Sequence, residues 1–258
     1  MRERGIDVKQ DLNGVGKNLH DHPAVAVFHG GGRVGYGLSL RNIPQVLLSP
    51  FNYLFFGKGL WASNTVEGGG FAKTDARLNE PDVQFHFIPA RLGHQQKMIV
   101  WGQGYYSDVC LLKPKSRGEL KLGAEQDSLD INLNLLSDPE DYERMLDGLE
   151  LLRRIMAAPA FDSVRSSELA PGPEIQTRED LKAYLHQRLG TAYHPVGSCK
   201  MGDENDPNSV VCPRLKLIGS ENIRVIDASV MPEVVAGNTN APTMMIAEKG
   251  SAIMLGND

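Results

Sequence analysis

Residues 81–88 constrain the fold most, because their polarity alternates with a period of two. Val83, Phe85 and Phe87 share one face of this segment, which is typical of a half-buried β-strand. Further strand candidates lie at residues 24–30, 109–112, 119–122 and 131–135. Short strands at this spacing favour an antiparallel sheet with one solvated face.

Two regular helices are expected to follow the strands. The first begins after Asp138, because Pro139 suits a first helical turn and acidic residues suit the positive end of the helix dipole. The second begins at Thr177, whose hydroxyl can cap the amide of Asp180. The buried stripe of the first helix is expected to be Met145, Leu149, Leu152 and Met156.

Two other segments carry weaker helical patterns. Pro44 and Pro50 interrupt residues 43–56, so we expect short helical pieces there and no long helix. Near the C-terminus, residues 223–227 predict a short strand, and a loop and a helix over 243–255 follow it. The predicted fold class is therefore α+β, with an antiparallel sheet and flanking helices.

Composition excludes several functional classes. With 258 residues, of which 41% are apolar, the chain can form one large domain or two small ones. The net charge of −5 offers no basic surface to nucleic acid. No segment has the apolar length of a signal peptide or a transmembrane span. Three separated cysteines predict a reducing cytoplasm, and only His20 with His22 approaches metal-ligand spacing, so no metal is expected.

Two segments contain residues that could carry chemistry. In AYHPVGSCKMG, His194 lies beside a proline, and a histidine in such a place is more often structural than catalytic. Asp227 ends the predicted C-terminal strand, where a carboxylate binds nucleotide hydroxyls or caps a turn. The following helix begins near Pro242, and its unpaired first amides favour negative charge in the preceding loop.

Five motifs together resemble one enzyme family. In chain order they are VGKNLHDHP, PKSRGELKL, AYHPVGSCKMG, IRVIDASVMP and GNTNAPTMMIAEK. They resemble the glucose-methanol-choline (GMC) oxidoreductases, in particular the choline-dehydrogenase-like members. The resemblance implies FAD-dependent oxidation of a primary alcohol to an aldehyde, with hydride transfer to the flavin. It leaves the electron acceptor open among a quinone, another carrier and oxygen.

The resemblance also implies roles for single residues. His194 matches the active-site histidine that accepts the proton of the substrate hydroxyl, as a general base with a pKa near neutrality does. Asn240 matches the second active-site position. The implied cofactor-binding residues are Asp227, Ala228, Asn238, Pro242 and Thr243. Arg117 is interpreted as pairing locally within its turn, and no catalytic role is assigned to the NLHDH segment.

One part of the family's pattern does not occur where it is expected. The family opens with a glycine-rich turn and helix that bind the ADP part of FAD. Gly30, Gly32 and Gly35 follow a strand, but Pro44 and a further glycine argue against a helix there. We therefore interpret the chain as a C-terminal portion, with a missing N-terminal half as a candidate partner.

The implied organisation has three parts. Residues 1–30 form a domain-junction segment, residues 31–190 a substrate-binding domain, and residues 191–258 the C-terminal strand, loop and helix of an incomplete FAD-binding α/β domain. Without the rest of that domain, Met244, Met245, Ile246 and Ile253 are expected to be partly exposed. The alternative hypothesis is a catalytically silent fragment that acts as a binding or assembly module.

Overall fold

A computed structural model describes residues 5–30, 35–37, 39–40, 42–91, 101–125 and 128–256. Gly32 lies outside these described residues. The chain divides into two compact units. Unit 1 comprises Met1–Pro23, Leu112–Tyr142 and Thr191–Asp258, and unit 2 comprises Ala24–Leu111 and Glu143–Gly190. The three-part domain organisation expected from the sequence stays a prediction.

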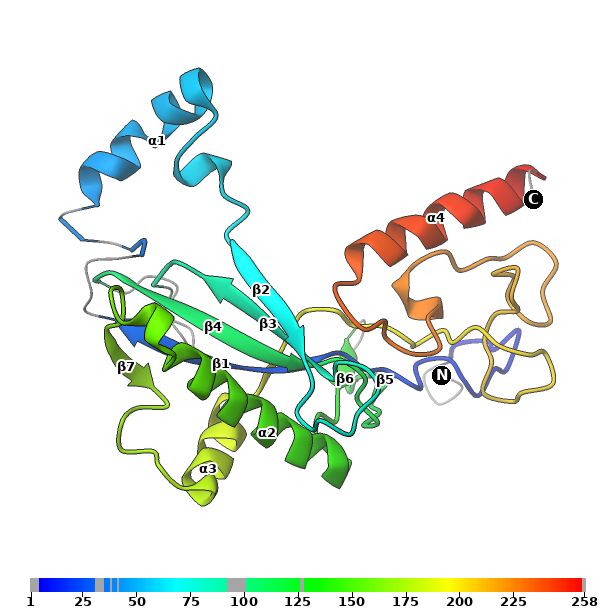
Figure 1. Ribbon diagram of the computed structural model, residues 1–258. Helices are drawn as coiled ribbons and strands as arrows, with labels where there is room; N and C mark the ends of the chain where they lie inside the picture. The colour runs from blue at the N-terminus through cyan, green and yellow to red at the C-terminus, as the bar shows by residue number, and fades with distance from the viewer. Residues whose placement is uncertain are drawn as a thin grey trace. The chain divides into compact units, whose positions relative to one another are not determined.

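Unit 2 is built on an antiparallel sheet, as predicted (Figure 1). Its strands run in the order β2-β3-β4-β1-β7, and the two-residue β8 (Gly190–Thr191) also pairs with β1. The bounds are β1 Pro23–Gly30, β2 Gly68–Ala72, β3 Val83–Ile88, β4 Gly104–Leu111 and β7 Ser167–Ala170.

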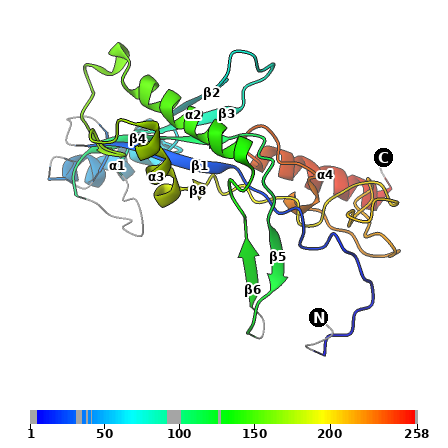
Figure 2. The ribbon, with the colours of Figure 1, turned by 90° about the horizontal axis from the view of Figure 1, so that it is seen from below.

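Two of the predicted strands do not join this sheet. In unit 1, β5 (Glu119–Leu122) and β6 (Leu129–Asn132) pair with each other as a two-stranded hairpin (Figure 2). The expectation of a strand over residues 131–135 was wrong in its extent, because Asn134 and Leu136 have φ angles of 50° and 54°. Left-handed backbone of this kind cannot continue a strand.

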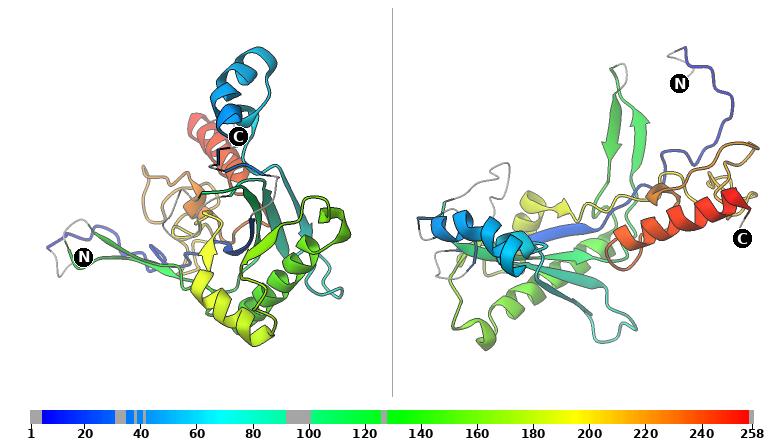
Figure 3. Two further views of the ribbon diagram at one scale, coloured as in Figure 1. Left: turned by 90° about the vertical axis from the view of Figure 1, so that its left-hand side faces the viewer. Right: turned by 90° about the horizontal axis from the view of Figure 1, so that it is seen from above.

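The helix α2 (Pro139–Met156) lies across one face of the unit 2 sheet (Figures 1 and 3). Its predicted stripe is confirmed, since Met145, Leu149, Leu152 and Met156 are all buried. Gly148 allows the close approach to the sheet: an added Cβ would lie 3.1 Å from Val109 Cγ2. Leucine and methionine on the helix therefore form the core with β3 and β4.

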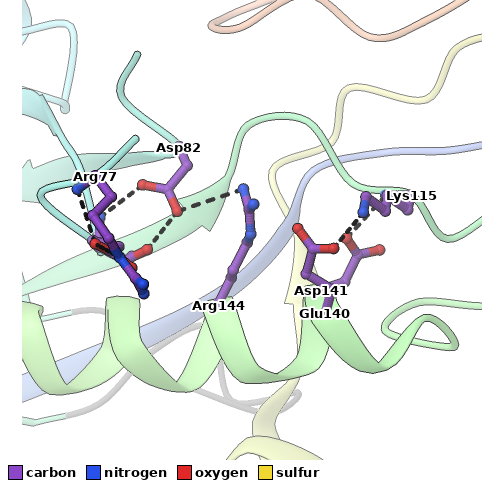
Figure 4. Close-up of polar contacts among 8 residues, drawn as sticks. Arg77, Asp82, Lys115, Glu140, Asp141 and Arg144 are labelled. Carbon is purple, nitrogen blue, oxygen red and sulfur yellow. Dashed lines mark hydrogen bonds and ion pairs between the residues drawn. The ribbon is translucent and has the colours of Figure 1, made fainter. Parts of the chain in front are cut away.

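Charged side chains in the first turns of α2 contact neighbouring segments, each within its own unit (Figure 4). In unit 1, the buried Asp141 carboxylate accepts the backbone N–H groups of Lys115 (2.9 Å) and Ser116 (2.7 Å), and Lys115 pairs with Glu140. In unit 2, Arg144 lies 3.9 Å from Asp82. Asp141 thus holds the turn before β5 in addition to favouring the helix dipole.

The second predicted helix, α3 (Arg178–Arg188), has the expected capping box. The Asp180 N–H donates to Thr177 Oγ1 (3.1 Å), and the Thr177 N–H donates to Asp180 Oδ2 (3.1 Å). Leu181 and Leu185 are buried. A 3-10 turn, η3 (Pro159–Phe161), lies between α2 and β7.

The prediction of short helical pieces over residues 43–56 was wrong. The segment forms one helix, α1 (Ile43–Phe56), because Pro44 falls in the first turn and Pro50 removes only one hydrogen bond. A second 3-10 turn, η2 (Leu60–Ala62), is tied to α1 by the Leu60 N–H, which donates to Ser49 Oγ (3.1 Å). The helix has exposed apolar side chains: Ile43, Val46, Leu47, Leu48, Phe51, Tyr53, Leu54, Phe55 and Phe56.

The C-terminal segment of unit 1 differs from the prediction in two ways. Residues 223–227 form no strand, since Arg224 makes only an isolated bridge with Lys216. After the 3-10 turn η4 (Ala228–Val230), the helix α4 (Asn240–Leu255) begins three residues earlier than predicted. Met244 and Met245 are exposed as expected, and Ile246 packs against core residues.

Ile253, in contrast, is buried, so its expected exposure was wrong. It lies near the C-terminal end of α4, where Gly250 is also buried. An added Cβ at Gly250 would lie 2.5 Å from Ile226 Cγ2, which shows how closely the helix packs on residues 215–230. Within the described ranges, no helix has the length and apolar content needed to cross a bilayer.

Replacing Leu149 by alanine tests the core between α2 and the sheet. We expect Leu149→Ala to lower the free energy of unfolding by about 2–5 kcal/mol, because a fully buried leucine leaves a cavity. Ile155→Ala on the same helix is the matched control, and its half-exposed side chain predicts a much smaller loss. Urea unfolding followed by circular dichroism measures both, and equal losses would contradict the packing.

Candidate active site

His194 lies where two distant parts of unit 1 run side by side. The His20 N–H donates to the Val196 carbonyl (3.1 Å), and the Val196 N–H donates back to the His20 carbonyl (2.9 Å). A further bond joins the Ala192 N–H to the His22 carbonyl (3.0 Å). The NLHDH segment, to which no catalytic role was assigned from the sequence, therefore pairs with the segment that contains His194.

The buried Asp21 carboxylate fixes the backbone at His194. Its Oδ1 accepts the N–H of His194 (2.9 Å) and the N–H of His22 (2.6 Å). Burial raises the pKa of Asp21, although these two bonds and one from the Thr191 side chain oppose that rise. A buried carboxylate is stable only with such donors, so this one specifies the geometry around it.

His20 ties the same segment to the loop before α4. The ring Nδ1 donates to the Asn18 carbonyl (2.6 Å), and Nε2 accepts the Val234 N–H (2.9 Å). These two bonds define a neutral imidazole with its proton on Nδ1. Burial lowers the pKa of His20 from 6.5 to about 4, in keeping with that neutral form.

The His194 imidazole lies against the side chains of His22 and Asn238. The His22 ring meets it edge-on, with 5.3 Å between ring centroids and 86° between the planes. His22 is itself fixed, since its Nε2 donates to the Val235 carbonyl (3.0 Å). In the contact with Asn238, the amide Nδ2 lies 3.4 Å from His194 Nε2.

The two asparagines of the GNTNAP motif lie in different places. Asn238 is in the loop and contacts His194, whereas Asn240 is the exposed first residue of α4. The sequence had put Asn240 at the second active-site position and Asn238 under the cofactor. Motif spacing cannot separate the two, because only the start of the helix decides which amide turns toward the histidine.

Arg117 and Asn18 hold the NLHDH segment in place through hydrogen bonds. Arg117 Nη1 donates to the Pro114 carbonyl (2.6 Å), as the local interpretation predicts, and Nε donates to Asn18 Oδ1 (2.9 Å). Asn18 Nδ2 then donates to the Pro232 carbonyl (3.0 Å). Asn18 has a φ of 57°, a conformation that asparagine tolerates better than most residues. The PKSRG turn is therefore structural.

Asp227 acts as a turn cap in this structure. Its Oδ1 accepts the Ser229 N–H (2.8 Å) and also the Ser229 hydroxyl, and the side chain is exposed. The Cys199 N–H donates to the Ser229 carbonyl (2.9 Å), which joins η4 to the segment that follows His194. Asp227 therefore caps this turn, as one of the two interpretations from the sequence predicts.

The first turn of α4 has the features of an anion site. The Thr239 side chain makes no capping bond, and Pro242 has no amide hydrogen. The Thr243 N–H and hydroxyl both donate to the Thr239 carbonyl (2.9 and 2.7 Å). The N-terminal amides before Thr243 have no intrahelical acceptor, so they fit the negative charge that a reduced flavin carries on its pyrimidine ring.

Metal ligation has no comparable support in the described part of the chain. No group of three or more His, Cys, Asp or Glu side chains is placed there to hold a metal ion. His20 and His22, the pair with the closest ligand spacing, each direct ring nitrogens to the backbone. Their bonds hold segments together instead.

Because His20 is neutral when folded, unit 1 should lose stability in acid. Between pH 6.5 and about 4 the unfolded chain binds a proton at His20 that the folded chain does not. The free energy of unfolding therefore falls as pH decreases through this window, by roughly 3 kcal/mol in total. Urea unfolding at pH 7.5, 6.0 and 4.5 measures the loss.

His20→Gln is the matched variant for this measurement. Its amide oxygen can still accept the Val234 N–H, but it does not titrate. We expect lower stability than the parent at pH 7.5 and a smaller further loss at pH 4.5. An unchanged pH dependence would assign the acid sensitivity to another group.

Gly197 packs tightly against the segment that contains Asn18. It has a φ of 92°, and an added Cβ would lie 2.3 Å from the Asn18 carbonyl oxygen. We expect Gly197→Ala to cost at least about 1–3 kcal/mol of stability, from overpacking and left-handed strain. Gly70→Ala is the control, because no atom lies within 4 Å of its added Cβ. Equal thermal stability of the two variants would contradict this packing.

Known proteins share both the sequence and the fold. Alcohol dehydrogenase [acceptor] from Pseudomonas putida is 43% identical over 99% of this chain and 46% of its own length. Oxygen-dependent choline dehydrogenase from Sinorhizobium medicae is 36% identical over 99% of this chain and 47% of its own length. The chain therefore spans about half the length of these relatives.

Solved structures of flavoenzymes have the same fold. The Aspergillus oryzae RIB40 formate oxidase variant R554K, studied for its FAD modification, superposes with a TM-score of 0.84 at 23% identity, over 99% of this chain and 49% of that one. The pyridoxine 4-oxidase from Mesorbium loti gives a TM-score of 0.79 at 24% identity, over 98% of this chain and 46% of that one. The curated relatives are oxidoreductases, in agreement with the class that the motifs predicted.

The family's sequence profile, described as GMC oxidoreductase, matches residues 114–247. This range contains His194, Asn238 and the first half of α4. The match covers more than half of the chain and agrees with the resemblance that the five motifs indicated. The chain belongs to the GMC oxidoreductase family.

Proposed function

We propose that this chain is the C-terminal part of an FAD-dependent enzyme that oxidises a primary alcohol to an aldehyde, with His194 as the general base. The contact between His194 Nε2 and the Asn238 amide supports this proposal most directly. The amide nitrogen of asparagine can only donate a hydrogen bond, so Nε2 is the acceptor in this contact and is the unprotonated nitrogen of the ring. A base requires that state.

The chemistry needs a proton acceptor and an orienting amide at the same substrate oxygen. A substrate hydroxyl can donate to His194 Nε2 where Asn238 now does, and the amide can then donate to the substrate oxygen. The flavin, when bound, accepts the hydride. Holding the hydroxyl between these two groups fixes the orientation of the carbon, and such alignment supplies a large part of the rate.

The residues present fit the pyrimidine end of a flavin. The loop with Asn238 leads into the first turn of α4, whose unpaired amides favour negative charge. Pro242 and Thr243 begin that helix, and Thr243 braces its first turn. Asp227 caps the η4 turn, which begins at Ala228, and we assign these two residues to the linker between the two halves of FAD. The ADP-binding turn would then belong to the rest of the protein.

A primary alcohol is the proposed substrate class. The Pseudomonas putida relative named alcohol dehydrogenase shares 43% of its aligned residues with this chain, against 36% for the Sinorhizobium medicae choline dehydrogenase.

The second active-site residue that we propose is Asn238 and not Asn240. An amide at this position stays neutral, so proton transfer falls to His194 alone.

Replacing His194 tests the base. We expect His194→Gln to lower kcat by about 10²–10⁴-fold, because glutamine hydrogen-bonds without accepting a proton. The test enzyme combines this chain with the half of the Pseudomonas putida alcohol dehydrogenase that the chain does not match. His186→Gln on α3 is the control, since it removes an exposed histidine of unit 2. Full activity of His194→Gln would reject the proposal.

The same assay compares the two amides. Asn238→Ala should reduce kcat more than Asn240→Ala does, because only Asn238 contacts His194 in the structure. The opposite order would return the second position to Asn240. If the assembled protein binds FAD and no alcohol bleaches the flavin absorbance, the alternative of a silent binding or assembly module gains support.

A further inference from the structure

We propose that Asp21 is a positioning residue for His194: the turn 191–194 wraps around its buried carboxylate, and this sets the direction of the His194 ring. The inference rests on the proposed function for its meaning in catalysis. The geometry that carries it lies wholly within unit 1.

The carboxylate of Asp21 is surrounded by donors from the turn. Oδ1 accepts the N–H groups of His22 and His194, and the Thr191 side chain adds a third hydrogen bond. Thr191 Oγ1 also accepts the Tyr193 N–H (3.1 Å). The Thr191 side chain and the N–H groups of Tyr193 and His194 thus depend, directly or through Thr191, on one carboxylate of a residue that is 2% exposed.

The backbone at Tyr193 is strained in the manner that this wrapping requires. Tyr193 has a φ of 62° and its side chain is 89% exposed, so side-chain packing does not hold it there. A bulky residue in left-handed backbone costs of order 1–3 kcal/mol and persists only where its surroundings enforce it. The bonds of Thr191 and His194 to Asp21 hold the residues on either side of Tyr193, together with the bond from the Ala192 N–H to the His22 carbonyl.

The fixed position of the His194 backbone limits the directions that the His194 ring can take. Asp21 accepts hydrogen bonds from the backbone N–H groups of His22 and His194, so it fixes the backbone that carries each ring. The two rings therefore meet edge-on at 5.3 Å, with His22 anchored to the Val235 carbonyl. If the turn is released, the His194 ring has no fixed approach to Asn238.

Histidine NMR provides a readout that needs neither flavin nor turnover. The full 258-residue chain is labelled with ¹³C and ¹⁵N histidine, and the His194 signals are identified by their loss in His194→Gln. We expect Asp21→Ala to move the His194 and His22 ring signals toward those of the exposed His186. The signals of His29 and His86, in unit 2, should stay in place.

Two further variants keep the test decisive if Asp21→Ala unfolds. Asp21→Asn retains an oxygen that accepts both N–H groups, so its His194 signals should stay close to those of the parent. Thr191→Val removes the third donor at nearly constant volume, so it should shift the His194 signals partway. Unmoved His194 signals in Thr191→Val, and in Asp21→Ala if that variant folds, would overturn the inference.

Activity in the assembled enzyme then separates this inference from the proposed function. We expect Asp21→Ala to lower kcat about 100-fold with little change in KM, as displacement of a catalytic group does, and Asp21→Asn to recover most of the loss. If His194→Gln keeps full activity while Asp21→Ala shifts the His194 signals, the proposed base fails and the positioning role stands. If kcat falls without any shift of His194, the positioning role fails.

Discussion

The carboxylate of Asp21 must find hydrogen-bond donors, because leaving a buried charge unpaired costs several kcal/mol. Its donors come from the adjacent His22 and from residues 191–194 at the other end of unit 1. His20 has the same requirement, and the Val234 N–H satisfies it. The buried polar groups of His20 and Asp21 thereby join three parts of unit 1: the segment at Val196, the loop before α4 and the turn at His194.

Local features of the fold could be predicted from the sequence. The capping box at Thr177 and the apolar stripe of α2 involve residues within a few positions of each other, so their patterns carry the information. The rule for prolines failed at α1, because Pro44 sits where a helix needs no amide and one missing bond at Pro50 does not end it. The strand expected at 223–227 failed, because Arg224 finds only an isolated partner.

The candidate site could be predicted only in part. The motif around His194 indicated the histidine, but nothing in the chain's order shows that NLHDH supports it, since the two lie about 170 residues apart. Nor does the motif GNTNAP tell which asparagine contacts the ring, because that depends on α4 beginning at Asn240. Long-range pairing and helix termini decide these points, and both are properties of the folded chain.

The division of the chain into units also has a consequence for its synthesis. Unit 2 has all its residues once Gly190 has been made, whereas unit 1 needs both ends of the chain. Val234 follows its partner His20 by 214 residues, which at ribosomal rates of about 5–20 residues per second is a delay of roughly 10–40 seconds. Residues 15–22 are mostly polar, so water can serve their hydrogen bonds during this interval, and the nascent chain exposes little apolar surface there.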